Sequence, residues 1–347
     1  MSFIVKPLLN FLYSLRKKQE VNIKRILFLF PSSAVGDTVI ETFFIHEVKK
    51  LYPKAKLDIA ILAPYAVLLE NNPDINCIYK MPASIFKKLF WLATKAFFFR
   101  RQKYDLLLDL PHNGYAPFRQ IFLYFTNAKK TLSCNTKGYN FITYPLMWTE
   151  ENKKHITEEV YIKALKLLGA KGPFEVKYNL FIPVEIKNKV QVFLKQHNPN
   201  NKKILVFNPE GSKEPRTLTP QKVKEIIALL IQNTTYQIIL LSYKNFYKDM
   251  PANIAVFHTD NLIELVALIK QAEYVLTTDT GILHIADAFD KPMMVLFSEA
   301  NIDESPRPYV EYVWGSKNSK TKKLKARYSV NDIDIKEISK CLQDISY

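Results

Sequence analysis

The chain has 347 residues, which at about 100 to 200 residues per domain favours two domains and excludes a single small module. Apolar residues make up 48% and charged residues 24% of it, proportions that exclude disorder of the whole chain. Lys and Arg number 49 against 33 Asp and Glu, so the formal net charge of +16 favours an anionic partner: nucleic acid, anionic lipid or a phosphorylated substrate.

Two features bear on the compartment. Cys77, Cys134 and Cys341 are scattered and show no metal-like spacing with a histidine, so neither a disulfide framework nor a structural zinc site is expected. Residues 1–15 are largely apolar, but the basic residues follow this run instead of preceding it, and the run is shorter than the roughly 20 residues that span a bilayer. The sequence therefore predicts a cytoplasmic protein.

Strand-like and helical patterns alternate along the first half of the chain. Residues 25–30 form a continuous apolar run, typical of a strand buried on both faces, and residues 38–53 carry apolar side chains at helical spacing. The alternation continues at residues 57–62, 66–72, 77–80, 84–103, 104–110 and 158–170. Such a pattern predicts a parallel sheet.

The second half repeats the alternation more clearly, at residues 203–208, 219–233, 237–242, 261–272, 274–279, 281–289 and 293–298. We predict two doubly wound α/β domains, an N-terminal one over residues 1–171 and a C-terminal one over residues 186–347. Residues 172–185 contain two prolines and no helical period, so they are expected to be a linker. The last helix could pack back on the N-terminal domain.

Ligands of doubly wound sheets bind beyond the carboxyl ends of the strands, where three loops carry chemistry. In the first loop Gly36 allows a tight turn, and Asp37 places a carboxylate where a helix begins. A simple N-cap role explains Asp37 equally well. No GxGxxG follows the first strand and no GxxxxGK[ST] occurs, which disfavours a nicotinamide dehydrogenase and a P-loop nucleotidase.

The second loop joins a glycine, a hydroxyl and two cations ahead of a helix that starts near residue 219. Gly211 permits close approach of a ligand, and Ser212, Lys213 and Arg216 supply groups that bind phosphate. A solvated turn is the alternative, because glycine and proline serve turns as well.

The third loop is the most specific of the three. Thr278, Asp279, Thr280 and Gly281 follow a strand directly and open a helix, so hydroxyls and backbone amides meet at a helix N-terminus that suits an anion. His284 lies about one turn into that helix. The alternative for His284 is a histidine packed in the core.

Residues 84–103 interleave large apolar residues with lysine and arginine. Such a segment can lie in a membrane interface, where apolar side chains insert and cations meet lipid head groups. It can equally be a core-packed helix with a solvated basic face. Stacking of its aromatic residues on nucleic-acid bases is a third possibility, although no RRM, KH or helix-turn-helix signature accompanies it.

Together the three loops resemble glycosyltransferase family 9, the ADP-heptose:lipopolysaccharide heptosyltransferases. The matching motifs are GD at residues 36–37, YP at 52–53, PEGS at 209–212 followed by Arg216, and DTGILHIADAFDKPMMVLF at 279–297. Phe43 and Leu218 replace a proline and a tryptophan that are usual in the family, and the glycine and acidic residue usual after the strand at 237–242 are absent. The resemblance extends from about residue 25 to residue 297.

The resemblance implies a GT-B fold, in which two Rossmann-like domains face each other across a cleft, with the acceptor in the first and the sugar nucleotide in the second. It implies an inverting, metal-independent transfer of heptose from ADP-heptose to the lipopolysaccharide inner core at the anionic inner-membrane surface. Asp37 would be the general base and Arg216 would stabilise the leaving diphosphate, without a cofactor. The implied donor contacts are Glu210, Gly211, Ser212, Lys213, Thr278, Asp279, Thr280, Gly281 and His284, and the implied acceptor-side residues are Ser33 and Gly36.

Other functions remain open at this point. The charge permits a basic nucleic-acid-binding protein, and a related transferase could use another sugar nucleotide. A binding module with an inactive site is a further class. The one DxD pattern in the chain, Asp332 and Asp334, lies outside the three loops and is expected to form a solvated turn instead of a metal site.

Overall fold

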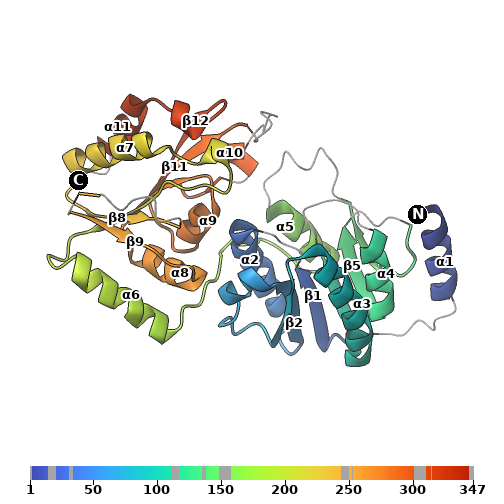
Figure 1. Cartoon of the computed structure of the whole chain (residues 1–347). Helices are drawn as coiled ribbons and strands as arrows, with labels where there is room; N and C mark the ends of the chain where they lie inside the picture. Colours follow the sequence, from blue (N-terminus) through green and yellow to red (C-terminus); the bar gives the residue numbers. More distant parts are fainter. Residues whose placement is uncertain are drawn as a thin grey trace. The chain divides into compact units, whose positions relative to one another are not determined.

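A computed structural model describes residues 2–14, 21–30, 34–110, 117–134, 138–147, 158–243, 250–251, 253–300, 310–313 and 315–343. The chain divides into two compact units, residues 1–153 with 157–179 (unit 1) and residues 154–156 with 180–347 (unit 2). The division at residue 180 lies within the stretch 172–185 that the sequence assigns to a linker. Each unit is a six-stranded parallel sheet with helices on both faces (Figure 1). The prediction of two doubly wound α/β halves is confirmed.

Unit 1 has the strand order β3-β2-β1-β4-β5-β6, which is the order of a Rossmann sheet. Its elements are α1 (Ser2–Ser14), β1 (Arg25–Phe30), α2 (Val35–Leu51), β2 (Lys56–Leu62), η1 (Ala63–Leu68), β3 (Cys77–Met81), α3 (Ile85–Gln102), β4 (Leu106–Asp109), α4 (Pro117–Thr126), β5 (Lys130–Cys134), β6 (Tyr144–Leu146) and α5 (Glu158–Leu167).

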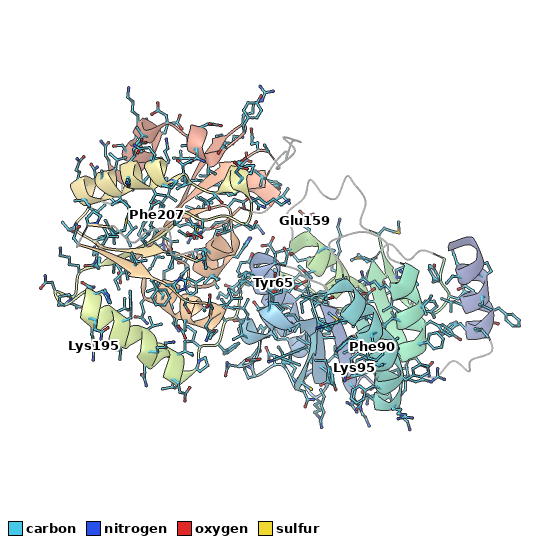
Figure 2. All side chains as sticks on the ribbon, in the orientation of Figure 1. Tyr65, Phe90, Lys95, Glu159, Lys195 and Phe207 are labelled. Atoms are coloured by element: carbon cyan, nitrogen blue, oxygen red, sulfur yellow. The ribbon has the colours of Figure 1, made fainter. Side chains whose placement is uncertain are left out.

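The helix predicted over residues 84–103 forms as α3 and has two different faces. Phe99 is fully buried against Leu107 of β4 and Phe122 of α4, whereas Phe90 projects from the outer side of the helix (Figure 2). The helix therefore packs in the core on one face, as its core-packed alternative expects, but its other face exposes phenylalanine as well as basic residues.

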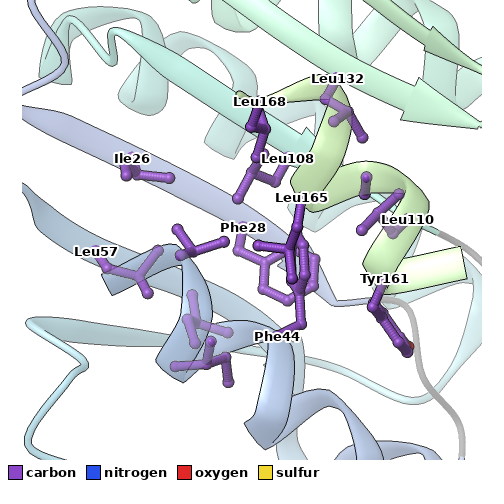
Figure 3. Packing of buried hydrophobic residues seen from close by; sticks show 14 of the residues in the cluster. Ile26, Phe28, Phe44, Leu57, Leu108, Leu110, Leu132, Tyr161, Leu165 and Leu168 are labelled. Atoms are coloured by element: carbon purple, nitrogen blue, oxygen red, sulfur yellow. The ribbon is translucent and has the colours of Figure 1, made fainter. Parts of the chain in front are cut away.

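The central strand β1 explains why unit 1 needs helices on both sides of its sheet. Alternate side chains of a strand point to opposite faces. Phe28 accordingly packs with Phe44 of α2 and Tyr161 of α5 (Figure 3), and Leu27 packs in the other cluster, beneath α1, α3 and α4. The apolar run at residues 25–30 is thus a strand buried on both faces, as predicted.

Unit 2 repeats this arrangement in the order β12-β11-β10-β7-β8-β9, the same order as unit 1 when each unit is counted from its own first strand. Its elements are α6 (Val184–His197), β7 (Ile204–Asn208), η3 (Glu214–Arg216), α7 (Pro220–Asn233), β8 (Gln237–Leu241), β9 (Ile254–Phe257), α8 (Leu262–Gln271), β10 (Tyr274–Thr278), α9 (Gly281–Ala288), β11 (Met293–Ser298), α10 (Val310–Val313), β12 (Thr321–Ala326), η4 (Val330–Asp332) and α11 (Ile335–Gln343). The last helix, α11, packs against α7 and β12 of its own unit.

Three local differences separate structure from sequence pattern. The helical pattern at 66–72 is only partly helical: the 3₁₀ helix η1 ends at Leu68 and a turn follows, near Asn71, Asn72 and Pro73, residues that favour turns. Helix α6 begins at Val184 directly after Pro183, inside the stretch expected to be extended. Strand β12 does not show a continuous apolar run because it lies at a sheet edge and is half-exposed.

No helix in the described part of the chain is long and apolar enough to cross a bilayer.

We expect Phe99→Ala to lower the free energy of unfolding of unit 1 by about 3 to 5 kcal/mol, because it empties a fully buried site. Phe97→Ala on the same helix is the matched control. Phe97 is 62% exposed, so its loss should change stability by less than about 1 kcal/mol. Urea unfolding followed by circular dichroism measures both values, and equal losses would contradict the assignment of α3's two faces.

Candidate functional site

Asp37 lies in the first turn of α2, just beyond the carboxyl end of β1. The N-cap of α2 is Ala34, so the alternative in which Asp37 serves as an N-cap is wrong. Gly36 is buried, and the Asp37 carboxylate is half-buried. Ser33, the other residue predicted on the acceptor side, lies outside the described residues. Asp37 is instead an acidic residue of the first helical turn, at the carboxyl edge of the sheet.

A second carboxyl group, Glu41, lies one helical turn beyond Asp37 and is fully buried. Tyr161 of α5 donates a hydrogen bond to its Oε1 over 2.8 Å. Burial, and then the charge of Asp37, raise the pKa of Glu41 well above its usual value. Sequence reasoning missed Glu41, although a carboxylate among the apolar positions of residues 38–48 is a usable signal. The site in unit 1 thus holds a half-exposed carboxylate above a buried carboxyl group.

Tyr65 lies in η1, directly after β2 (Figure 2). It is close enough to Asp37 for the charge of Asp37 to affect its hydroxyl group. Burial, and then the charge of Asp37, raise the pKa of the Tyr65 hydroxyl. The hydroxyl therefore stays protonated and able to donate near the carboxylate. This residue was not predicted, because no spacing in the sequence links it to the loop after β1.

In unit 2 an ion pair joins the two loops that were predicted to bind the donor. Arg216, in η3 after β7, places its Nη1 atom 3.6 Å from Oδ2 of Asp279, which follows β10. The side chains are 17% and 7% exposed, so water screens the pair only partly. Because β7 and β10 are paired neighbours, their carboxyl ends bring these loops together.

Asn208 lies at the centre of this edge of the sheet. Its Nδ2 atom donates to Oγ1 of Thr277 over 3.0 Å and to Oγ1 of Thr280 over 3.2 Å. Thr280 is the N-cap of α9 and accepts from the backbone of Ile282, so α9 begins at Gly281 as predicted. Asn208 and Thr277 were not named among the site residues, although a polar residue that ends an apolar strand is the signal for them. They hold the helix N-terminus beside Asp279.

The Gly211 loop folds back on Arg216. A Cβ atom at Gly211 would lie 2.3 Å from the backbone oxygen of Arg216, so glycine is required for this close approach. The hydroxyl of Thr217 accepts from the Gly211 amide over 3.1 Å and donates to the carbonyl oxygen of Lys213 over 3.0 Å. The loop therefore closes on itself and holds Arg216 in place, and the solvated-turn alternative does not describe it fully.

The remaining predicted donor residues do not all gather in one place. Ser212 and Lys213 are exposed and line a pocket of about 630 Å³, which also contacts Tyr328. Arg216 and Asp279 are not part of its lining. The structure thus places Ser212 and Lys213 in this pocket, apart from Asp279 in the ion pair.

Three further predicted residues, Glu210, Thr278 and His284, are buried in unit 2. The burial of His284 is what its core alternative predicts. Burial, and then the charge of Glu210, raise the pKa of Tyr243, which follows β8 and was not predicted. In the DxD pattern, Asp332 accepts from the Ser329 amide and Asp334 from the Lys336 amide, as expected of a turn.

Comparison with known proteins agrees with this arrangement. Residues 98–332 match the profile of glycosyltransferase family 9 (heptosyltransferase). The chain belongs to glycosyltransferase family 9. A protein of Escherichia coli K12, provisionally named lipopolysaccharide heptosyltransferase 4, is 23% identical over 99% of this chain and 95% of its own length. The chain is therefore related to heptosyltransferases of lipopolysaccharide biosynthesis, as the sequence resemblance implied.

Two solved structures show the same fold as this family 9 chain. The family 9 glycosyl transferase of Veillonella parvula superposes with a TM-score of 0.78 at 16% identity, covering 95% of this chain and 99% of the other. E. coli ADP-heptose lps heptosyltransferase II gives a TM-score of 0.71 at 16% identity, covering 92% and 98%. The GT-B architecture expected from the three loops is thereby confirmed.

We expect Glu41→Gln to gain stability over the wild type as pH rises. The raised pKa means that the folded chain holds this proton while the unfolded chain releases it above about pH 4.3. The wild type therefore loses up to about 1.4 kcal/mol per pH unit above that value, a loss that Gln avoids while still accepting from Tyr161. The test is to measure the free energy of unfolding of both proteins from about pH 4 to about pH 7 and to compare the two at each pH. Glu185→Gln is the matched control, because Glu185 lies exposed on α6 and the change removes a carboxyl group from the surface only.

Proposed function

We propose that this family 9 glycosyltransferase moves a heptose from ADP-heptose to the inner core of lipopolysaccharide, with inversion at the anomeric carbon. The names of its relatives support the substrate class, and one neighbouring structure is an ADP-heptose enzyme. The single observation that carries the proposal is the Arg216–Asp279 ion pair at the N-terminus of α9, because it holds a guanidinium beside a helix N-terminus where the family's motifs predict the diphosphate.

In the proposed reaction Asp37 takes the proton of an acceptor hydroxyl. The hydroxyl oxygen then forms a bond to the anomeric carbon while the bond from that carbon to the diphosphate breaks, and ADP leaves with the electron pair. A half-exposed carboxylate in a first helical turn can reach a ligand and still accept a proton. The neighbouring Tyr65 hydroxyl and buried Glu41 supply a polar wall behind it.

Arg216 stabilises the charge that develops on the departing diphosphate, together with the backbone amides of Thr280 and Gly281. Asp279 holds the guanidinium in one orientation, so no reorganisation is needed as the charge forms. A bidentate guanidinium and a helix N-terminus fit two phosphate groups without a divalent ion. We therefore propose a metal-independent transfer that needs no cofactor beyond the donor.

A family 9 transferase that uses another sugar nucleotide is the second candidate. It rests on the chain's own departure from the family, since Tyr243 and a lysine-rich segment follow β8 where a glycine and an acidic residue are usual. A thermal-shift screen of ADP-, GDP- and UDP-sugars distinguishes the two. Stabilisation by ADP-heptose alone supports the first candidate, and stabilisation by a different nucleotide supports the second.

We expect Asp37→Asn to lower the transfer rate by about 100 to 10,000-fold, which is the range for loss of a general base. Binding of ADP, measured by calorimetry, should stay within error of the wild type because Asp37 belongs to unit 1 and the proposed donor site to unit 2. Asp332→Asn, at an exposed turn, is the matched control and should keep full activity. A fully active Asp37→Asn variant would remove Asp37 from the reaction.

EDTA should leave the transfer rate unchanged, whereas Arg216→Gln should lower kcat by about 100 to 1,000-fold, as loss of a charge-stabilising donor does. A radiolabelled-sugar transfer assay measures both effects. Complete inhibition by EDTA that magnesium or manganese reverses would overturn the metal-independent mechanism. Inhibition of that kind with an unaffected Arg216→Gln variant would assign the leaving-group role to a metal.

A further inference from the structure

One side of unit 1 is covered by three helices, α1, α3 and α4, of which α4 contacts both α3 and α1 (Figure 1). Their 41 residues (13, 18 and 10) contain no Asp or Glu. Over the whole chain acidic residues number 33 of 347, so about four would be expected by composition alone. We call the outer surface of these helices the α1–α3–α4 face.

Large apolar side chains project from this face. Phe90 is 73% exposed, Phe97 is 62% exposed, and Phe11 on α1 is 63% exposed. Leu8 is exposed beside Phe11, one turn earlier on α1. Phe125 of α4 is exposed as well and lies 6.0 Å, ring centroid to centroid, from Phe97. The apolar surface is thus continuous from α3 to α4.

Cations share the same side of α3. Lys87, Phe90, Phe97 and Arg101 follow one another at intervals of three, seven and four residues, which places them on one side of a helix. Arg100 is exposed next to Arg101. Lys95 lies 4.6 Å from the ring centroid of Phe98, so its charge rests over an aromatic face. The phenylalanines are therefore bordered by positive charge.

The inner faces of α1 and α3 pack against the rest of unit 1, so the exposed side chains on their outer faces do not result from loose packing. On α1, Leu9 is buried in the unit 1 core, and Asn10 bonds with both Gly138 and Asn140. On α3, Phe99 is fully buried. The apolar side chains of the outer face are thus additional to those that fold the unit.

We propose that the α1–α3–α4 face docks unit 1 on an anionic lipid bilayer. Phenylalanines enter the acyl boundary and the bordering lysines and arginines meet lipid phosphates, with the helices lying in the plane of the interface. The chemistry of the face matches that of such a surface: apolar in its interior, negative at its border. This proposal does not rest on the transferase activity.

A membrane fits this face better than nucleic acid does. Leu8 and Leu12 are exposed on α1 beside Phe11, and aliphatic side chains neither stack on bases nor contact phosphate. The exposed rings also lie along convex helices, whereas proteins that stack single-stranded bases do so along a groove. An oligonucleotide complex and a dimer of this chain are therefore outcomes that the experiment must separate from lipid binding.

The test is flotation of the full chain with vesicles of phosphatidylcholine alone or mixed with phosphatidylglycerol. The wild type should float with the mixed vesicles, weakly at high salt and strongly at low salt. Lys87→Ser/Arg100→Ser/Arg101→Ser should lower the partition coefficient roughly 100-fold, at about fivefold per cation. Phe11→Ser/Phe90→Ser/Phe97→Ser should abolish the binding that survives high salt.

Lys187→Ser/Lys195→Ser/Lys224→Ser, three exposed lysines of unit 2, is the matched control for charge and should float as the wild type does. Absence of wild-type flotation at physiological salt overturns the proposal. It is overturned equally if the unit 2 control loses as much binding as the α3 variant, or if the cation variant loses oligonucleotide binding while vesicle binding is unchanged. A wild-type dimer that becomes a monomer in the phenylalanine variant, again without change in flotation, assigns the face to a second copy.

The same variants separate docking from catalysis. With a water-soluble acceptor that lacks acyl chains, both docking variants should transfer sugar at the wild-type rate. Asp37→Asn should still float although it is inactive. A floating wild type that transfers no heptose would contradict the proposed function and leave the docking surface standing.

Discussion

The pairing of β7 with β10 is the constraint on which the site in unit 2 depends. It places Asn208 opposite Thr277, and the Asn208 amide then bonds to both Thr277 and the N-cap of α9, Thr280. Parallel pairing ends both strands at one edge, so the loops that carry Arg216 and Asp279 must leave from neighbouring points. The buried Asn208 amide network and the partly buried ion pair act together. The network fixes the start of α9, and the ion pair fixes the guanidinium beside that start.

Unit 1 uses the same architecture for different electrostatics. Where unit 2 presents a cation at a helix N-terminus, unit 1 presents the carboxyl group of Asp37 in the first turn of α2. Glu41 lies one turn deeper, buried and bonded to Tyr161, with its pKa raised mainly by burial. The inner carboxyl group therefore holds its proton to a higher pH than an exposed glutamate does. One fold thus places a carboxyl group at the sheet edge of one unit and a guanidinium group at the sheet edge of the other.

Helix α3 carries large apolar side chains on two sides. Its inner side supplies Phe99 and Ala96 to the core, and its outer side leaves Phe90 and Phe97 in solvent. A helix needs only one apolar stripe to pack on a sheet, so the outer phenylalanines are not needed to cover the sheet of unit 1. The inner side of α3 already covers the sheet, and the outer phenylalanines remain exposed to solvent.

The sequence by itself determined the alternation of strands and helices, the doubled Rossmann pattern and the motifs at Asp37, Arg216 and Asp279, because these depend on local periodicity and on residues close together in the chain. It did not reveal Glu41 with Tyr161, 120 residues apart, or Asn208 with Thr280, 72 residues apart. Those partnerships depend on which strands pair and which helices cross them. The sequence also did not decide whether residues 84–103 pack in the core or are exposed, since amphipathicity does not say how much of a helix the core will cover. The packing of α3 against α4 and the sheet decided which side chains are buried. Tertiary structure was needed wherever two distant segments had to share one environment.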